Sequence, residues 1–93
     1  MDTSKQLTLK QAVAERIRGL LAERNLTQYR FEQISGITHG HLSHILYNKK
    51  GGSNNSLSLT TLLIIAQGFN MTMAEFLNKP IFNYENISVN KKI

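Results

Sequence analysis

The chain has 93 residues, of which 41% are hydrophobic and 18% are charged, and these values are typical of one small globular domain. It has no cysteine, which excludes disulfides, thiolate zinc sites and cysteine nucleophiles, and 11 basic against 6 acidic residues give a net charge of +5. That excess is compatible with a polyanionic partner, but it does not show whether the partner is nucleic acid or anionic lipid, or whether there is such a partner at all. No apolar run approaches the roughly 18 residues of a membrane span, and the N-terminus lacks the apolar part of a signal peptide, so we expect a cytoplasmic protein without membrane contact.

Five segments with helical periodicity follow one another along the chain. The first is expected to begin after Thr8, with Gln11 completing a capping box, and to end near Asn25. The second covers about residues 28–35 and has Thr27 as its N-terminal cap.

Gly36 follows the second helix, where a glycine readily adopts the left-handed conformation that ends a helix. On this helix Phe31 and Ile34 are expected to face inward. Thr38 then caps a third helix of about residues 39–48.

In the third helix Leu42, Ile45 and Leu46 share one face, because they are three and four residues apart. The opposite face is therefore available to solvent or to a partner. The polar, glycine-rich residues 48–56 are expected to form a loop.

Ser58 is expected to cap a fourth helix, closed by Gly68 with Phe69 in the contact that accompanies a glycine cap. A fifth helix is predicted from Thr72, which has Glu75 three residues further on, to about residue 79.

Pro80 ends the fifth helix or lies just beyond it. The alternating residues Asn86 to Asn90 suggest a short strand, and the apolar residues of the segment from Ile81 onward are expected to pack on the domain or on a second copy of it.

All three histidines, His39, His41 and His44, lie within six residues of one another. A metal site is disfavoured, because the side chains at 39 and 41 point about 160° apart on a helix and the nearest carboxylate in sequence is Glu32. A solvated polar face without a partner remains an alternative for them. No nucleophile elbow, phosphate-binding glycine loop or zinc-protease motif is present, so we expect no enzyme and no cofactor.

The second and third helices with the short turn between them have the arrangement of a helix-turn-helix. Over roughly residues 10 to 78 the chain resembles the lambda-repressor-like, Xre/Cro family of helix-turn-helix DNA-binding domains, an all-α fold of five helices. The matching positions are Leu26, Thr27, Gln28, Phe31, Ile34, Gly36, Ile37, Thr38, Leu42, Ser43, Ile45 and Asn48, then Ser58, Leu59, Thr61, Leu62, Ile65, Ala66, Gly68, Phe69, Asn70, Thr72, Glu75, Phe76 and Leu77. Glu32 departs from the pattern, since the best-known repressors have a small residue there, and Ile34 is expected to supply the apolar contact instead.

This resemblance implies that the third helix is the recognition helix and lies in the major groove. The positions implied to read base edges are His39, Gly40, Ser43 and His44. Those implied to hold phosphates are Thr27, Gln28, Thr38, His41, Tyr47, Asn48, Lys49 and Lys50. A helical wheel at about 100° per residue agrees, because Gly40, His44 and Tyr47 lie opposite the apolar face.

The resulting prediction is a DNA-binding domain over residues 8–79, followed by an extension over 80–93 that is a possible dimer contact. Its function would be sequence-specific binding of double-stranded DNA as a small transcriptional regulator, probably a repressor in view of the family. Useful specificity would need a homodimer on a two-fold related operator, with half-sites roughly 34 Å apart. No small-molecule effector is evident. The alternative is a protein-interaction module, such as the antitoxin partner of a toxin.

Overall fold

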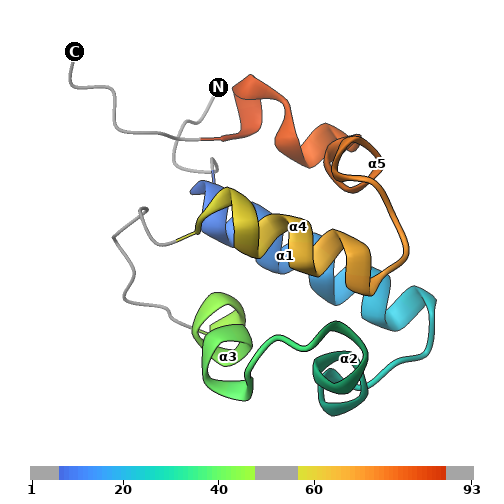
Figure 1. The fold of residues 1–93 in the computed structure, drawn as a ribbon. Coiled ribbons are helices and arrows are strands. Elements are labelled where there is room, and N and C mark those ends of the chain that lie inside the picture. The colour runs from blue at the N-terminus through green and yellow to red at the C-terminus, as the bar shows by residue number, and fades with distance from the viewer. Residues whose placement is uncertain (1–6, 48–56, 88–93) are drawn as a thin grey trace.

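The computed structural model describes residues 7–47 and 57–87, and these residues form five α-helices and two short 3-10 helices (Figure 1). The elements are α1 (Leu9–Glu23), α2 (Gln28–Ser35), α3 (His39–Tyr47), α4 (Leu59–Gly68), α5 (Met73–Leu77), η2 (Pro80–Phe82) and η3 (Tyr84–Asn86). The all-helical fold is confirmed. Within the described residues no helix is both long and apolar enough to cross a membrane.

Side-chain caps begin the helices at the positions where the sequence predicts them. The Thr8 side chain accepts a hydrogen bond from the Gln11 backbone N–H, and the Gln11 side chain accepts one from the Thr8 backbone N–H. Thr72 and Glu75 form the same reciprocal pair at α5. Because each cap involves residues only three apart, local sequence is sufficient to predict it.

The helices pack around one core in which α1 contacts α3, α2 contacts α4, and α4 contacts α5. In Figure 1, α2 and α3 lie on one side of α1 and α4, and α5 with the 3-10 helices lies on the other. The rings of Phe31 and Phe69 stack at the centre of the core with their centroids 4.2 Å apart. This packing fixes α2 and α3 relative to the rest of the domain.

Two expectations about apolar and glycine residues are wrong. Ile34 is 50% exposed, because Phe31 occupies the inward face of α2 and Ile34 lies at the edge of that face, about 60° around the helix from Phe31. Gly68 does not cap α4: it is the last helical residue, and the left-handed residue that follows is Asn70, with φ 62°. The absence of a side chain at Gly68 instead allows close packing, because a Cβ there would lie 2.6 Å from the Cβ of Ser35.

The described part of the C-terminal segment folds back onto the same chain. Phe82 packs against Phe76, with ring centroids 6.2 Å apart, and Ile87 forms a single parallel β-bridge with Leu7. Asn86 belongs to η3 and not to a strand, and the rest of the predicted strand, residues 88–90, lies outside the described residues. The boundary predicted between residues 79 and 80 stays a prediction.

Candidate nucleic-acid interface

The third helix has one buried face and one polar face. Leu42, Ile45 and Leu46 are at most 5% exposed and hold α3 on the core. The residues predicted to read bases lie on its outer side: His39, Gly40 and His44 are exposed, and Ser43 is half-buried. The predicted amphipathic pattern of this helix is confirmed, since the core fills the apolar side and leaves the polar side uncovered.

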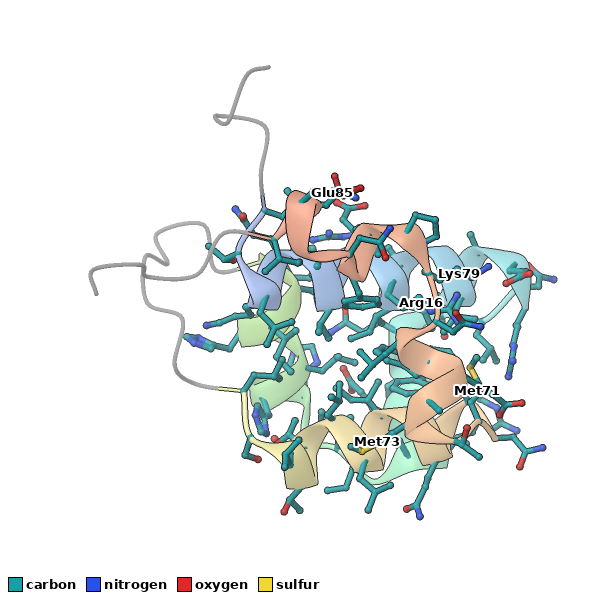
Figure 2. The ribbon with its side chains drawn as sticks, turned by 90° about the horizontal axis from the view of Figure 1, so that it is seen from above. Arg16, Met71, Met73, Lys79 and Glu85 are labelled. Atoms are coloured by element: carbon teal, nitrogen blue, oxygen red, sulfur yellow. The ribbon has the colours of Figure 1, made fainter. Side chains whose placement is uncertain are left out.

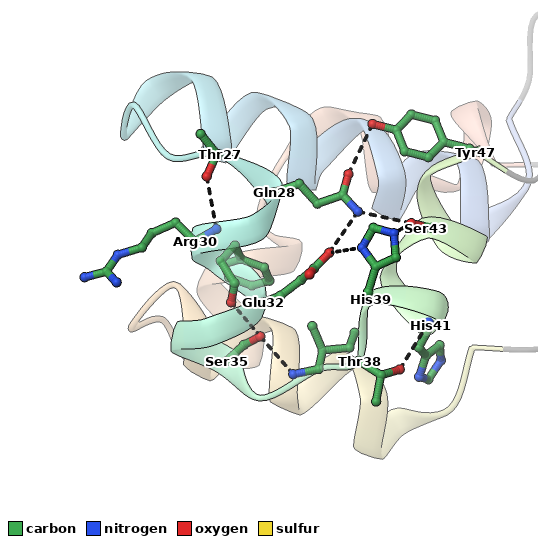
Figure 3. A network of polar contacts seen from close by, with 12 residues as sticks. Thr27, Gln28, Arg30, Glu32, Ser35, Thr38, His39, His41, Ser43 and Tyr47 are labelled. Atoms are coloured by element: carbon green, nitrogen blue, oxygen red, sulfur yellow. Dashed lines mark hydrogen bonds and ion pairs between the residues drawn. The ribbon is translucent and has the colours of Figure 1, made fainter.

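A carboxylate joins this polar face to α2 (Figure 3). Glu32 Oε2 lies 2.8 Å from Nδ1 of His39 and accepts a hydrogen bond of 3.0 Å from the side-chain amide of Gln28. The Glu32 side chain is only 10% exposed, whereas that of His39 is 75% exposed. A charge that is nearly buried needs such partners, so the contacts with His39 and Gln28 stabilise the position of Glu32 between the two helices.

Further hydrogen bonds extend the cluster along α3. The amide of Gln28 also donates to Ser43 Oγ at 3.2 Å, and the Tyr47 hydroxyl donates to Oε1 of Gln28 at 3.3 Å. Ser43 Oγ in turn lies 3.4 Å from Nε2 of His39. We call Gln28, Glu32, His39, Ser43 and Tyr47 the Glu32 network. It brings together four of the residues predicted to contact DNA, around one that the sequence did not single out for this role.

Residues of α1 contact the same helix from its other end. Lys10 is only 6% exposed, and its Nζ lies 3.2 Å from Nε2 of His44. Arg18 donates to the Leu46 carbonyl and lies over the Tyr47 ring, 5.7 Å from its centroid. Sequence reasoning missed both residues, because they are about 30 positions away from α3 along the chain.

The other predicted contact residues have simpler surroundings. The side chains of Thr27 and Thr38 cap α2 and α3 by accepting from the backbone N–H of Arg30 and His41. The side chain of His41 is exposed and does not belong to the Glu32 network. The predicted phosphate contacts Asn48, Lys49 and Lys50 lie outside the described residues.

Metal binding has no support in this geometry. No three histidines, aspartates or glutamates within residues 7–47 and 57–87 lie close enough together to hold an ion. His39 has Glu32 at its Nδ1, and His44 has the ammonium of Lys10 at its Nε2, which is an environment that repels a cation.

The fold and this face define a small helical domain that exposes a polar helix from a helix-turn-helix unit. The family model of the Cro/C1-type helix-turn-helix DNA-binding domain matches residues 16–79, and the chain therefore belongs to this family. No curated protein and no solved structure matched the chain. Membership confirms the predicted resemblance, and it supports DNA binding and a part in transcription regulation.

Proposed function

We propose that the protein is a sequence-specific DNA-binding transcriptional repressor that reads the major groove with α3. The observation that carries this proposal is the division of α3 into a buried apolar face and an exposed face of imidazole and hydroxyl groups. These groups offer hydrogen-bond donors and acceptors, which is what base edges in the major groove require. Repression needs only that the bound protein occupies its operator, so a single domain of this size is sufficient for it.

In this proposal His39, Gly40, Ser43 and His44 face the base edges. Gly40 has open space where a Cβ would be, so the backbone can approach the groove closely there. The phosphate contacts come from Thr27, Gln28, Thr38, His41, Tyr47, Asn48, Lys49 and Lys50. The N-terminus of α2 assists them, because its backbone N–H groups attract anions.

The first experiment is selection of bound sequences from a random duplex DNA pool, carried out with the wild-type protein and with His44→Ala. We expect a two-fold related motif, and we expect the variant to relax one position in each half-site, at a cost of about 1–3 kcal/mol in binding. Gln67→Ala is the control, since it removes an exposed polar side chain from α4, outside the helix-turn-helix unit.

Thermal unfolding of His44→Ala must accompany the selection, because this substitution also removes the partner of Lys10. If the wild-type protein yields only salt-sensitive binding without a motif, sequence-specific recognition is wrong. The alternative, a protein-interaction module such as an antitoxin, would then be tested at Leu59 and Leu63. These residues lie four apart on α4 and are 73% and 41% exposed.

We also propose that the protein binds as a homodimer on a two-fold related operator. One recognition helix reaches only a few base pairs, so two copies with half-sites roughly 34 Å apart would supply the specificity. The proposed dimer contact is α5 with the segment that follows it. Support comes from two facts: α5 lies on the opposite side of the domain from α2 and α3 (Figure 1), and Ala74 and Lys79 are exposed.

A further inference from the structure

When His39 is neutral, the hydrogen bonds of the Glu32 network are consistent with one arrangement of hydrogen atoms. The Tyr47 hydroxyl donates to the Gln28 carbonyl oxygen, and the amide nitrogen of Gln28 has two hydrogens, which go to Glu32 and to Ser43. Ser43 Oγ therefore accepts from Gln28 and retains its own hydrogen for another partner. Nε2 of His39, 3.4 Å away, is that partner.

The carboxylate determines which nitrogen of His39 is protonated. An ionised carboxylate only accepts hydrogen bonds, so Nδ1 of His39, 2.8 Å from Glu32 Oε2, must hold a hydrogen. Neutral His39 then has a lone pair at Nε2, in agreement with the hydrogen that Ser43 has available. A proton taken up from solvent can bind only at Nε2, and it converts this atom from an acceptor to a donor.

We propose that Glu32 determines the base preference of His39 and makes that preference depend on pH. This inference rests on the proposed function, in which α3 lies in the major groove. With neutral His39, an exocyclic amine takes the place of Ser43, 3.4 Å away in the free protein, as the donor to Nε2, and this favours adenine or cytosine. With His39 protonated, Nε2 donates to O6 or N7 and favours guanine. Glu32 is a positioning residue in this scheme, since it acts on DNA through His39.

The charged groups around α3 make Glu32 the residue that controls His39. From α2, Glu32 contacts the imidazole, whereas Arg30 points away from it and bonds to Gln33 of its own helix (Figure 3). From α1, Lys10 contacts His44, and Arg18 lies at Tyr47.

Within residues 7–47 and 57–87, two further titratable groups lie on α1 and α3. Glu15 of α1 is paired with Arg18, 3.2 Å away, and so belongs to the Tyr47 end of α3. The remaining imidazole of α3, that of His41, lies outside the network. The contact between Glu32 and His39 thus links α2 to the first turn of α3.

The first test needs no DNA. Nitrogen-15 chemical shifts of the His39 imidazole in the free protein at pH 8 report which ring nitrogen is protonated. We expect hydrogen on Nδ1 in the wild-type protein, and a mixture of both tautomers in Glu32→Gln, whose amide can either donate or accept. Hydrogen mainly on Nε2 in the wild-type protein would overturn the inference, whatever the protein binds.

The second test is selection from a random duplex DNA pool at pH 5.5 and at pH 8, with the same ionic strength. We expect one position of the motif to change from adenine or cytosine at pH 8 to guanine at pH 5.5, with a preference of about fivefold each way, as one hydrogen bond provides. Glu32→Gln should lose the preference for adenine or cytosine at pH 8, because Nε2 then has a hydrogen in part of the molecules. Glu23→Gln is the matched control, since it removes the same charge from the last turn of α1, and it should retain the change.

The outcomes separate this inference from the proposed function. A motif with the same base at every position at both pH values would refute the role of Glu32 and leave sequence-specific DNA binding intact. A preference for adenine or cytosine at pH 8 that is undiminished in Glu32→Gln would show that Glu32 does not set it, and would overturn the inference. The absence of any motif at both pH values would refute the proposed function itself.

Discussion

Gly68 lies where the end of α4 passes α2, and its missing side chain lets the two helices touch. A Cβ at this position would lie 2.6 Å from the Cβ of Ser35 and 2.8 Å from a ring carbon of Phe31. Phe31 is fully buried and stacked on Phe69, so its ring has no space into which to move. This glycine is therefore required by packing between helices and not by backbone conformation.

We expect Gly68→Ala to lower the free energy of unfolding by about 1–3 kcal/mol, the usual cost of forcing extra atoms into a packed core. Gly19→Ala is the matched control: Gly19 lies within α1 with open space around it, and the substitution should raise stability by about 0.5–1 kcal/mol through helix propensity. Urea denaturation measures both changes. If Gly68→Ala were as stable as the wild-type protein, the close approach of α2 and α4 would be wrong.

The contacts of some residues can be predicted from the sequence, whereas those of others cannot. The caps Thr8, Thr27 and Thr72 were predictable, because each accepts a hydrogen bond from a backbone group three residues along the chain. The position of Glu32 was not, although its spacing of four from Gln28 places both side chains on one face of α2. Its contact with His39 depends on the angle between two helices, and no local pattern encodes that angle.

Two arginines of α1 and Arg24, which caps its C-terminal end, each bond to backbone carbonyls at the C-terminal end of another helix. Arg16 donates to the carbonyls of Phe76 and Glu75 at 2.8 and 3.1 Å, at the end of α5 (Figure 2). Arg18 does the same at α3 and Arg24 at α4. The last turn of a helix exposes unpaired carbonyls and a partial negative charge, so a guanidinium there supplies both hydrogen bonds and charge.

Because of these contacts, part of the positive charge of the chain serves packing within the domain. The sequence offered all eleven basic residues to a polyanionic partner, yet these three guanidinium groups each stabilise the packing of α1 on another helix. Each also lies over an aromatic ring, at 5.5 to 5.7 Å from its centroid. Net charge alone therefore overestimates the surface available to DNA.

We expect Arg16→Ala to lower the free energy of unfolding by about 1.5 kcal/mol, because it removes two charged hydrogen bonds and exposes carbonyls of α5. Arg30→Ala is the control, since Arg30 is exposed and bonds only to Gln33 in its own helix, and its effect should be within about 0.5 kcal/mol. Thermal unfolding with calorimetry distinguishes them. Equal effects of the two substitutions would contradict a role for Arg16 in holding α5.

At the scale of the whole molecule, the segment after α5 is tied to the N-terminal end of the domain. The backbone N–H of Leu7 donates to the Asn86 carbonyl at 3.0 Å, and Phe82 packs against the core. Deleting the segment from Ile81 would therefore remove contacts within one chain as well as any contact between chains. A dimer contact must be tested by substitution on an exposed face.

We expect the wild-type protein to sediment with twice the 10.5 kDa mass of one chain, and Ala74→Glu to sediment as a monomer, because a charge on the exposed face of α5 disfavours association. Leu63→Glu places the same charge on the exposed face of α4 and should leave the dimer intact. If Leu63→Glu dissociates the dimer and Ala74→Glu does not, the contact lies on α4. If the wild-type protein sediments as a monomer, the proposal that the free protein forms a dimer is wrong.

The sequence by itself determined the five helices, their N-terminal caps and the polar face of α3, because these depend on residues three to seven positions apart and on helical periodicity. Only the tertiary structure decided that Glu32 contacts His39, that Lys10 contacts His44, and that Gly68 lies against Ser35. These contacts join residues that are brought together when helices pack at particular angles, and those angles follow from the shapes of all the buried side chains at once. The family of the protein could thus be predicted from its residues in order, whereas the arrangement of its candidate reading face could not.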